Sequence, residues 1–245
     1  MQLENKVGIV IVTYNLDARI FLLQIEGIKK FCKDDFEIRV IDNSSNPEMS
    51  RAIKYHAENL SLSYIRTSAS SINGTDSHAF SANVSYSFVR NTYDYLFYLD
   101  HDCIPVKPFS IVEILKDKIM AGLGQGKEIP YFWAGCVMWN NKDIDRDLIN
   151  FSPNHQFKID TGGELWKVID IYGKDKCTFF DEIPTQNPDF TEGFYNFYAM
   201  IHDGTFMHFI NSSGWNPSEK QTERLNSLLN IAKQKIDGIS NEGTA

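Results

Sequence analysis

The sequence predicts an α/β protein in which helices flank a central, mainly parallel β-sheet, and three observations support this class. Short apolar runs alternate with helical patterns through the first hundred residues. The first run, residues 7–12, is β-branched, as is typical of a strand buried on both faces. Polar residues follow three of the expected strands, at 13–15, 42–45 and 100–102. Ligands bind at such strand ends in open α/β sheets.

The N-terminal half contains the clearest elements. Four segments are expected to be strands: 7–12, 36–41, 62–65 and 93–99. A helix should follow the first strand, because apolar residues recur at helical spacing at Ile20, Leu23, Ile28 and Phe31. Pro47 suits the first turn of a second helix, and residues 78–92 are expected to form a third.

The second half is less regular. Further strands are expected over 131–139, 194–201 and 205–210, and further helices over 161–171 and 218–236. Asp203-Gly204 is a hairpin-type turn signal between two of these strands.

The last helix carries an apolar face and ends before a frayed tail over 238–245. That face consists of Leu225, Leu228, Leu229, Ala232 and Ile236. It could pack on the domain, mediate association or touch a membrane. We therefore divide the chain into a main domain, residues 1–215, and a C-terminal segment, residues 216–245.

Bulk composition narrows the class of function. The chain has 245 residues, 42% of them hydrophobic, which is enough for one large domain with a substantial core. Its net charge of -8 argues against a nucleic-acid partner. A nucleotide ligand is still compatible with this charge, because a bound metal can supply the positive charge. The first βα turn lacks G-x-G-x-x-G, so no dinucleotide fingerprint is present.

The chain is expected to work in the cytoplasm. No run approaches the ~18 apolar residues that span a bilayer, and the N-terminus enters a strand without signal-peptide architecture. Four scattered cysteines form no C-x-x-C pair, which favours reduced thiols over a zinc site. Glycosylation sequons fall in segments expected near the cleft, where a glycan would obstruct it: Asn43, Asn73, Asn83 and Asn211. Peripheral membrane contact remains compatible with these features.

Asp100 and Asp102 are the strongest candidate site residues. They follow the apolar, aromatic strand over 93–99 directly, separated only by His101. Carboxylates at a strand end are well placed to hold a hard divalent cation, Mn²⁺ or Mg²⁺, which in turn holds phosphate oxygens. His101 is expected to point to the other face of the strand and to be structural.

A second cluster with the same spacing provides an internal comparison. Asp143, Asp145 and Asp147 also alternate, but no apolar strand precedes them, and Lys142 and Arg146 flank or interleave them. This context indicates a solvated surface turn or helix start rather than a metal site.

Taken in order, these segments resemble the GT-A-fold glycosyltransferases of family 2, the large inverting group. The resemblance covers about residues 7–215 and rests on motifs at five places: Val12-Thr13-Tyr14-Asn15, Ile41-Asp42-Asn43-Ser44-Ser45, Asn73-Gly74, Ala82-Asn83, and Leu99-Asp100-His101-Asp102-Cys103-Ile104-Pro105. It implies a Rossmann-like GT-A fold and a nucleotide-diphosphate sugar as the donor.

The resemblance also implies roles for individual donor-binding residues. Thr13, Tyr14 and Asn15 would border the base and ribose. Asp42 would accept a hydrogen bond from the base or ribose, or would cap the turn after its strand. Asn83 would either face the donor or hold the neighbouring loop.

The metal site implied by the resemblance comprises three residues. Asp100 would face the nucleotide-sugar side, Asp102 would ligate the metal directly, and His208 would complete the site or contact the diphosphate.

An inverting transfer needs a carboxylate that takes the proton of the acceptor hydroxyl. The family's adjacent Glu-Asp pair is absent here; the corresponding segment is Asp160-Thr161-Gly162-Gly163-Glu164. Asp160 is the preferred base and Glu164 the reserve. Trp133 and Trp166 could stack on a sugar, although packing is expected for both.

The resulting hypothesis is a metal-dependent, inverting glycosyltransferase for polysaccharide biosynthesis, whose acceptor is a glycan or a lipid-linked sugar. Two alternatives stay open. A sugar-phosphate nucleotidyltransferase would favour a Gly-rich, basic loop after the first strand, which Thr13-Tyr14-Asn15 does not resemble. A non-catalytic relative that binds nucleotide sugars or glycans would be compatible with the missing acidic pair.

Overall fold

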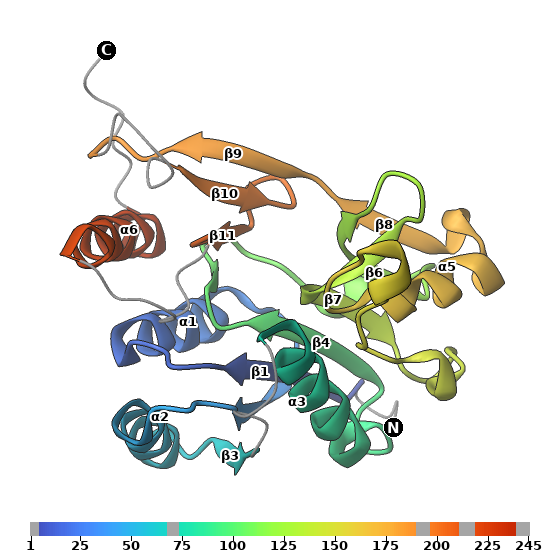
Figure 1. The fold of residues 1–245 in the computed structure, drawn as a ribbon, viewed down its shortest axis with the longest axis horizontal. Coiled ribbons are helices and arrows are strands. Elements are labelled where there is room, and N and C mark those ends of the chain that lie inside the picture. The colour runs from blue at the N-terminus through green and yellow to red at the C-terminus, as the bar shows by residue number, and fades with distance from the viewer. Residues whose placement is uncertain (1–4, 68–73, 190–196, 211–218, 239–245) are drawn as a thin grey trace.

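The computed structural model describes residues 5–67, 74–189, 197–210 and 219–238. A seven-stranded sheet in the order β3-β2-β1-β4-β7-β6-β8 forms the centre of the molecule (Figure 1). Its strands are β1 Val7–Thr13, β2 Phe36–Asp42, β3 Ser63–Arg66, β4 Tyr95–Asp100, β6 Met120–Gln125, β7 Tyr131–Asn140 and β8 Cys177–Phe180. Strands β1 to β4 run parallel and β7 runs antiparallel to β4, so the expected mainly parallel, mixed sheet is confirmed.

Helices cover both faces of this sheet. They are α1 Ala18–Phe31, α2 Pro47–Asn59, α3 Gly74–Val89, α4 Ile111–Ile114, α5 Trp166–Tyr172 and α6 Glu219–Asp237. Residues of α1, α2 and α6 share one apolar core, whereas α3 and α5 contribute to a second core. Strand β1 feeds both, since Ile9 and Ile11 enter the first core and Val10 and Val12 the second. This two-sided burial explains its continuous β-branched sequence.

A second, four-stranded antiparallel sheet, in the order β5-β11-β10-β9, was not expected from the sequence. Its strands are β5 Cys103–Pro105, β9 Glu182–Gln186, β10 Phe197–Ile201 and β11 Phe206–His208. Strands β10 and β11 are joined through Asp203-Gly204, as the turn signal predicted. Because β5 continues directly from the Asp100 turn, this sheet places His208 opposite Cys103 and close to Asp102.

The apolar face of α6 packs on the domain, the first of its three expected roles. Leu228, Ala232 and Ile236 are fully buried in the core that α1 also lines. Polar contacts tie the two helices together at their exposed edges, for example from Arg19 to Asn226 at 2.8 Å. Figure 1 shows α6 beside α1. The helix therefore completes the hydrophobic core of the domain.

Several boundaries differ from the expected ones. Helix α3 begins at Gly74, four residues before the expected start, and this brings its first turn into the cleft described below. The expected helix over 161–171 is instead a 3₁₀ turn, Gly163–Leu165, followed by the short helix α5, because Gly162 adopts a positive φ of 91°. Residues 194–196 and 239–245 lie outside the described residues. None of the described helices has the length and apolar character needed to cross a bilayer.

The close approach of α1 to β5 predicts a stability effect at Gly27. A Cβ added there would lie 2.3 Å from the carbonyl oxygen of Pro105. Overpacking costs about 1–3 kcal/mol, which exceeds the roughly 0.5–1 kcal/mol that alanine gains over glycine in a helix. We expect Gly27→Ala to lower the free energy of unfolding in chemical denaturation. Lys29→Ala, at an exposed position of the same helix, is the control. A Gly27→Ala protein as stable as the wild type would refute this packing argument.

Candidate functional site

A cleft of about 340 Å³ opens at the carboxyl edge of the parallel strands. Its walls include Thr13 and Tyr14 after β1, Asp100 and His101 after β4, and Gly74 at the start of α3. Strand β1 lies between β2 and β4, so the chain leaves β1 toward one side of the sheet and later returns on the other. Such a switch point is where open α/β sheets bind ligands. The cleft therefore lies where the sequence predicted it.

Asp42 is buried beneath this cleft and faces the protein. Its carboxylate accepts hydrogen bonds from five donors: the Thr13, Ser44, Ser50 and Tyr64 hydroxyls and the Ser44 backbone N–H, at 2.5 to 3.0 Å. Burial acts to raise the pKa of Asp42, but the hydrogen bonds from Ser44, Ser50 and Tyr64 outweigh it and leave the pKa below its usual value. Asp42 thus organises the loops after β1 and β2. This role resembles the second of its two expected roles, the capping of the turn after its strand.

The other two residues after β1 also bind the loop after β2. The Tyr14 hydroxyl lies 3.1 Å from the Ser45 hydroxyl. Asn15 adopts a positive φ of 43°, and its side chain accepts a hydrogen bond from the Asn46 backbone N–H at 2.8 Å. Of this pair, Tyr14 lines the cleft, whereas Asn15 fixes the loop behind it.

The turn that carries Asp100, His101 and Asp102 is held from two sides. Gln24 of α1, fully buried, donates from Nε2 to the carbonyl oxygens of Asp100 at 2.7 Å and Cys103 at 2.9 Å. The backbone N–H of Phe209 donates to the Asp102 carbonyl at 2.9 Å. Two separate segments therefore fix the backbone that carries both carboxylates. Sequence reasoning missed Gln24, because a polar residue on an apolar helix face carries no motif.

Asp100 and His101 form a buried ion pair in the cleft wall. His101 Nδ1 lies 3.1 Å from the carbonyl oxygen of Val12 and 3.0 Å from Asp100 Oδ1. Because a carbonyl can only accept, Nδ1 carries a proton. Burial acts to lower the pKa of His101, but the charge and hydrogen bond of Asp100 raise it to about 9. The pKa of Asp100 is far below its usual value: burial opposes this shift, and the charges of His78 and His101 overcome it. The expectation that His101 points to the other face of the strand was wrong, because it lines the cleft with Asp100. Its contacts with Val12 and Asp100 agree with the structural role expected for it.

Asp102 and His208 meet next to this cleft. His208 Nε2 lies 3.7 Å from Asp102 Oδ1, and among the described residues no group donates a hydrogen bond to that buried oxygen. Desolvation raises the pKa of Asp102, although the charge of His208 opposes it. On the other side of the ring, His208 Nδ1 lies 3.4 Å from Glu182 Oε1 of β9. Two of the three predicted metal ligands are thus brought together, while the Asp100 carboxylate engages His101.

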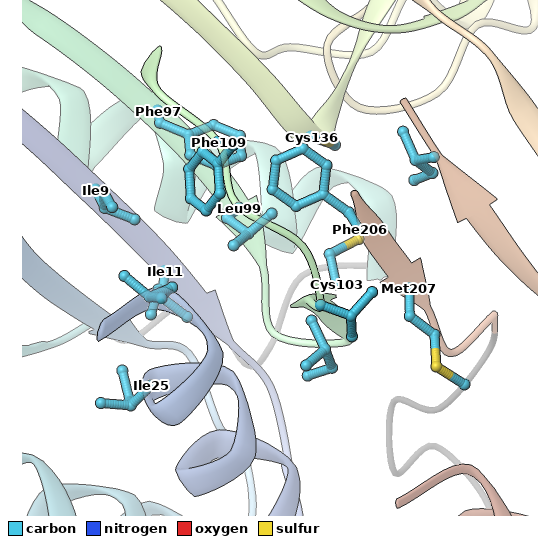
Figure 2. Close-up of a cluster of buried hydrophobic side chains, with 14 of the residues drawn as sticks. Ile9, Ile11, Ile25, Phe97, Leu99, Cys103, Phe109, Cys136, Phe206 and Met207 are labelled. Atoms are coloured by element: carbon cyan, nitrogen blue, oxygen red, sulfur yellow. The ribbon is translucent and has the colours of Figure 1, made fainter. Parts of the chain in front are cut away.

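Cys103 also lies near this pair, since its Sγ falls within 4.8 Å of ligand atoms of Asp102 and His208. Figure 2 shows its side chain in the apolar core with Phe206 and Met207. Burial raises the pKa of this thiol well above its usual value, so it stays protonated. A buried neutral thiol is a poor ligand for Mn²⁺ or Mg²⁺, which are hard cations that prefer oxygen donors.

The two candidate bases occupy different environments. Asp160 is exposed and lines the cleft, where its Oδ1 accepts the Thr161 backbone N–H at 2.7 Å. Glu164 instead accepts a hydrogen bond from Asn154 at 3.2 Å and forms an ion pair with Lys167. Asp160 therefore faces the cleft, whereas Glu164 is held by Asn154 and Lys167.

Asn83 shows the second of its two expected roles. Its Oδ1 accepts the Phe151 backbone N–H at 2.9 Å, and its amide nitrogen lies within 3.4 Å of Asn150 and Ser152 oxygens. The side chain therefore fixes the loop between β7 and Asp160. The comparison cluster at 143–147 is exposed, and Asp145 caps a short 3₁₀ helix at Asp147, which confirms the surface-turn interpretation.

Comparison with known proteins gives the fold. No protein-family model matches the sequence, and no curated protein does. A mannosyltransferase from Pyrobaculum calidifontis, PcManGT, solved in complex with GDP-Man and Mn²⁺, has a TM-score of 0.55 at 12% identity and covers 100% of this chain and 77% of its own. The galactosyltransferase LgtC, in complex with donor and acceptor sugar analogues, has a TM-score of 0.50 at 12% identity. The match covers 91% of this chain and 95% of LgtC.

A third structure, the bifunctional glycosyltransferase WbbM, is 13% identical with a TM-score of 0.42; 73% of this chain matches it, and the match spans 39% of WbbM. The likeness to the first two structures identifies the architecture. The chain has the GT-A fold of glycosyltransferases, as its sequence predicted.

The hydrogen bonds of Asp42 predict a pH-dependent stability effect. Asp42→Asn replaces an acceptor oxygen with a donor facing hydroxyl groups, which we expect to cost about 1–3 kcal/mol at pH 6. Because the folded-state pKa is depressed, the stability contributed by Asp42 is present above its unfolded pKa of about 3.9 and lost as the pH falls through the folded value. The stability gap between variant and wild type, measured by urea denaturation, should therefore shrink below about pH 4.

Asp145→Asn is the control for this experiment, because its exposed carboxylate caps a turn that asparagine also caps. A gap for Asp42→Asn that stays constant from pH 6 to pH 3 would contradict the role of the ionised carboxylate.

Proposed function

We propose that this chain is a metal-dependent, inverting glycosyltransferase similar to family 2, which transfers a sugar from a nucleotide-diphosphate sugar to a glycan or a lipid-linked acceptor. Its place would be the cytoplasm, in polysaccharide biosynthesis. The observation that carries the proposal is the pairing of Asp102 with His208 beside a cleft at the switch point of a GT-A fold.

The residues beside the cleft fit a divalent cation. Asp102 Oδ1 is buried without a hydrogen-bond donor among the described residues, a costly state for a carboxylate that a cation would relieve. Its partner His208 offers Nε2 on the same side, and Glu182 contacts the opposite ring nitrogen, as an outer carboxylate does at many metal-bound histidines. When bound, Mn²⁺ or Mg²⁺ would offset the negative charge that develops on the diphosphate leaving group.

The remaining cleft residues suit an anionic donor. The protonated His101 offsets the negative charge of Asp100 in the cleft wall, and the first turn of α3 contributes Gly74 and Thr75 to the lining. Backbone N–H groups at a helix N-terminus favour anions. Thr13 and Tyr14 would border the nucleoside, with Asp42, Asn15 and Asn83 holding the loops around it. PcManGT, whose fold this chain shares, was solved with GDP-Man and Mn²⁺, which supports the ligand class.

Asp160 would be the base. It is exposed at the cleft and keeps one carboxylate oxygen, Oδ2, outside the contacts with Thr161 that its Oδ1 makes. The acceptor hydroxyl would give its proton to this carboxylate while the oxygen attacks the anomeric carbon of the donor. Glu164 is less suited to this role, because Asn154 and Lys167 occupy both of its oxygens.

The metal assignment predicts that Asp102→Asn abolishes tight Mn²⁺ binding. Loss of an outer partner typically costs 10–100-fold in metal affinity, so loss of a direct ligand should cost at least about 100-fold. The measurement is the electron paramagnetic resonance signal of free Mn²⁺, titrated with protein and nucleoside diphosphate. Asp143→Asn, an exposed aspartate in the comparison cluster, should bind Mn²⁺ like the wild type. Unchanged binding by folded Asp102→Asn would rule out Asp102 as a ligand.

The base assignment predicts a loss of turnover without loss of donor affinity. Asp160→Asn should lower kcat by about 10²–10⁴-fold, measured as hydrolysis of the nucleotide sugar with water as the acceptor. Donor affinity, measured by calorimetry, should stay close to the wild-type value. Glu164→Gln is the matched variant and should retain most of the turnover. The reverse pattern for the two variants would assign the base to Glu164.

A further inference from the structure

Trp133 of β7 connects the two parts of the site. Its indole ring lines the cleft and packs against His208, with ring centroids 4.9 Å apart and planes inclined at 37°. Asp102 Oδ1 lies 3.7 Å from the Nε2 atom of His208. The indole therefore contacts a proposed metal ligand and also lines the cleft, and it remains partly exposed.

Gly135 makes this position of the indole possible. Residues 133 and 135 lie two apart on one strand, so their side chains would share a face of the sheet. A Cβ at position 135 would lie 2.3 Å from Cη2 and Cζ2 of Trp133. The ring thus lies along the strand over Gly135, in space that any larger residue would occupy.

The segment with Asp160 is fastened to the same stretch of β7. Gly162, with a φ of 91°, approaches so closely that a Cβ there would lie 2.3 Å from the Phe132 carbonyl oxygen. The backbone N–H of Ala134 points to the Thr161 carbonyl at 3.5 Å. These contacts flank position 133 on both sides along the strand. Asp160 and Trp133 therefore line the same part of the cleft in a fixed relation.

We propose that Trp133 is the platform on which the transferred sugar of the donor stacks, and that this sugar is a pyranose with an exposed C–H face. This inference rests on the proposed function. A diphosphate held beside His208 carries the sugar on its terminal phosphate. The indole contacts His208 and lines the same cleft as Asp160. An indole buries a large apolar area against a flat partner at little entropic cost, which suits a ring that must present its anomeric carbon to an incoming hydroxyl.

The test compares two ligands in each variant. Calorimetry with Mn²⁺ gives the Kd of the nucleotide sugar and of its own nucleoside diphosphate, taken from UDP, GDP and dTDP and their glucose, galactose and mannose derivatives. We expect Trp133→Ala to raise the ratio of these two Kd values on the order of tenfold, about 1.4 kcal/mol, with the nucleoside diphosphate Kd little changed. Because both values come from one protein, a general loss of folded protein cancels in the ratio.

Two further variants make the test specific. Trp166→Ala removes an indole at the start of α5, outside the cleft lining, and should leave the ratio at the wild-type value. Gly135→Ala keeps the indole but displaces it, so it should raise the ratio as Trp133→Ala does. A ratio that stays unchanged in Trp133→Ala overturns the platform while leaving the proposed function intact. If the wild type binds none of the nucleoside diphosphates with Mn²⁺, the proposed function fails and the platform fails with it.

Discussion

The parallel register of β1 between β2 and β4 is the constraint on which the site depends. Thr13 pairs with Asp42, and Asp100 pairs with Val12, so three strand ends finish at one edge of the sheet. Each end is polar, and the central strand β1, which pairs with both neighbours, is fully buried and cannot shift register without exposing its core residues. The cleft is the space that these ends leave at the switch point. Every other part of the site is attached to this edge by a specific contact.

Buried charge is distributed unevenly along that edge. Asp42 is satisfied by five donors and therefore serves the scaffold. Asp100 is neutralised by His101, which makes a charged but balanced wall. Asp102 differs from both, because its Oδ1 accepts no hydrogen bond from the described residues and lies beside the imidazole of His208. Three aspartates of one cleft region thus have three different electrostatic roles, and only the last fits a cation ligand.

The sequence predicted five of the seven strands of the central sheet and missed β6 and β8. Strands buried on both faces leave a strong local signal. The β-branched run of β1 and the aromatic run of β4 are examples, and the polar ends that follow them marked the cleft correctly. In the second sheet, the hairpin of β10 and β11 was predicted. Strands β5 and β9 were missed, because β5 has three residues and β9 is exposed and lacks alternation. Their pairing depends on contacts between distant segments that no local pattern encodes.

The site residues also divide into those that a local motif predicts and those that depend on contacts between distant segments. Asp102 and His208 were predicted as partners from the resemblance, and the structure brings them together. Gln24, Glu182 and the wall position of His101 could not be predicted, since each depends on how separate elements meet. Asp42 shows the converse: a motif position marked it as a ligand contact, whereas its burial and five hydrogen bonds turn it inward.

The most direct test of a metal-bound diphosphate at this edge is a crystal structure of the protein grown with Mn²⁺ and the nucleoside diphosphate that it binds best. Anomalous scattering from manganese would locate the ion independently of any assumption about the site. We expect one strong anomalous peak about 2.0–2.3 Å from Asp102 Oδ1 and His208 Nε2, with phosphate oxygens completing the coordination. A peak elsewhere, or nucleotide bound in the cleft with no manganese beside Asp102, would contradict this account.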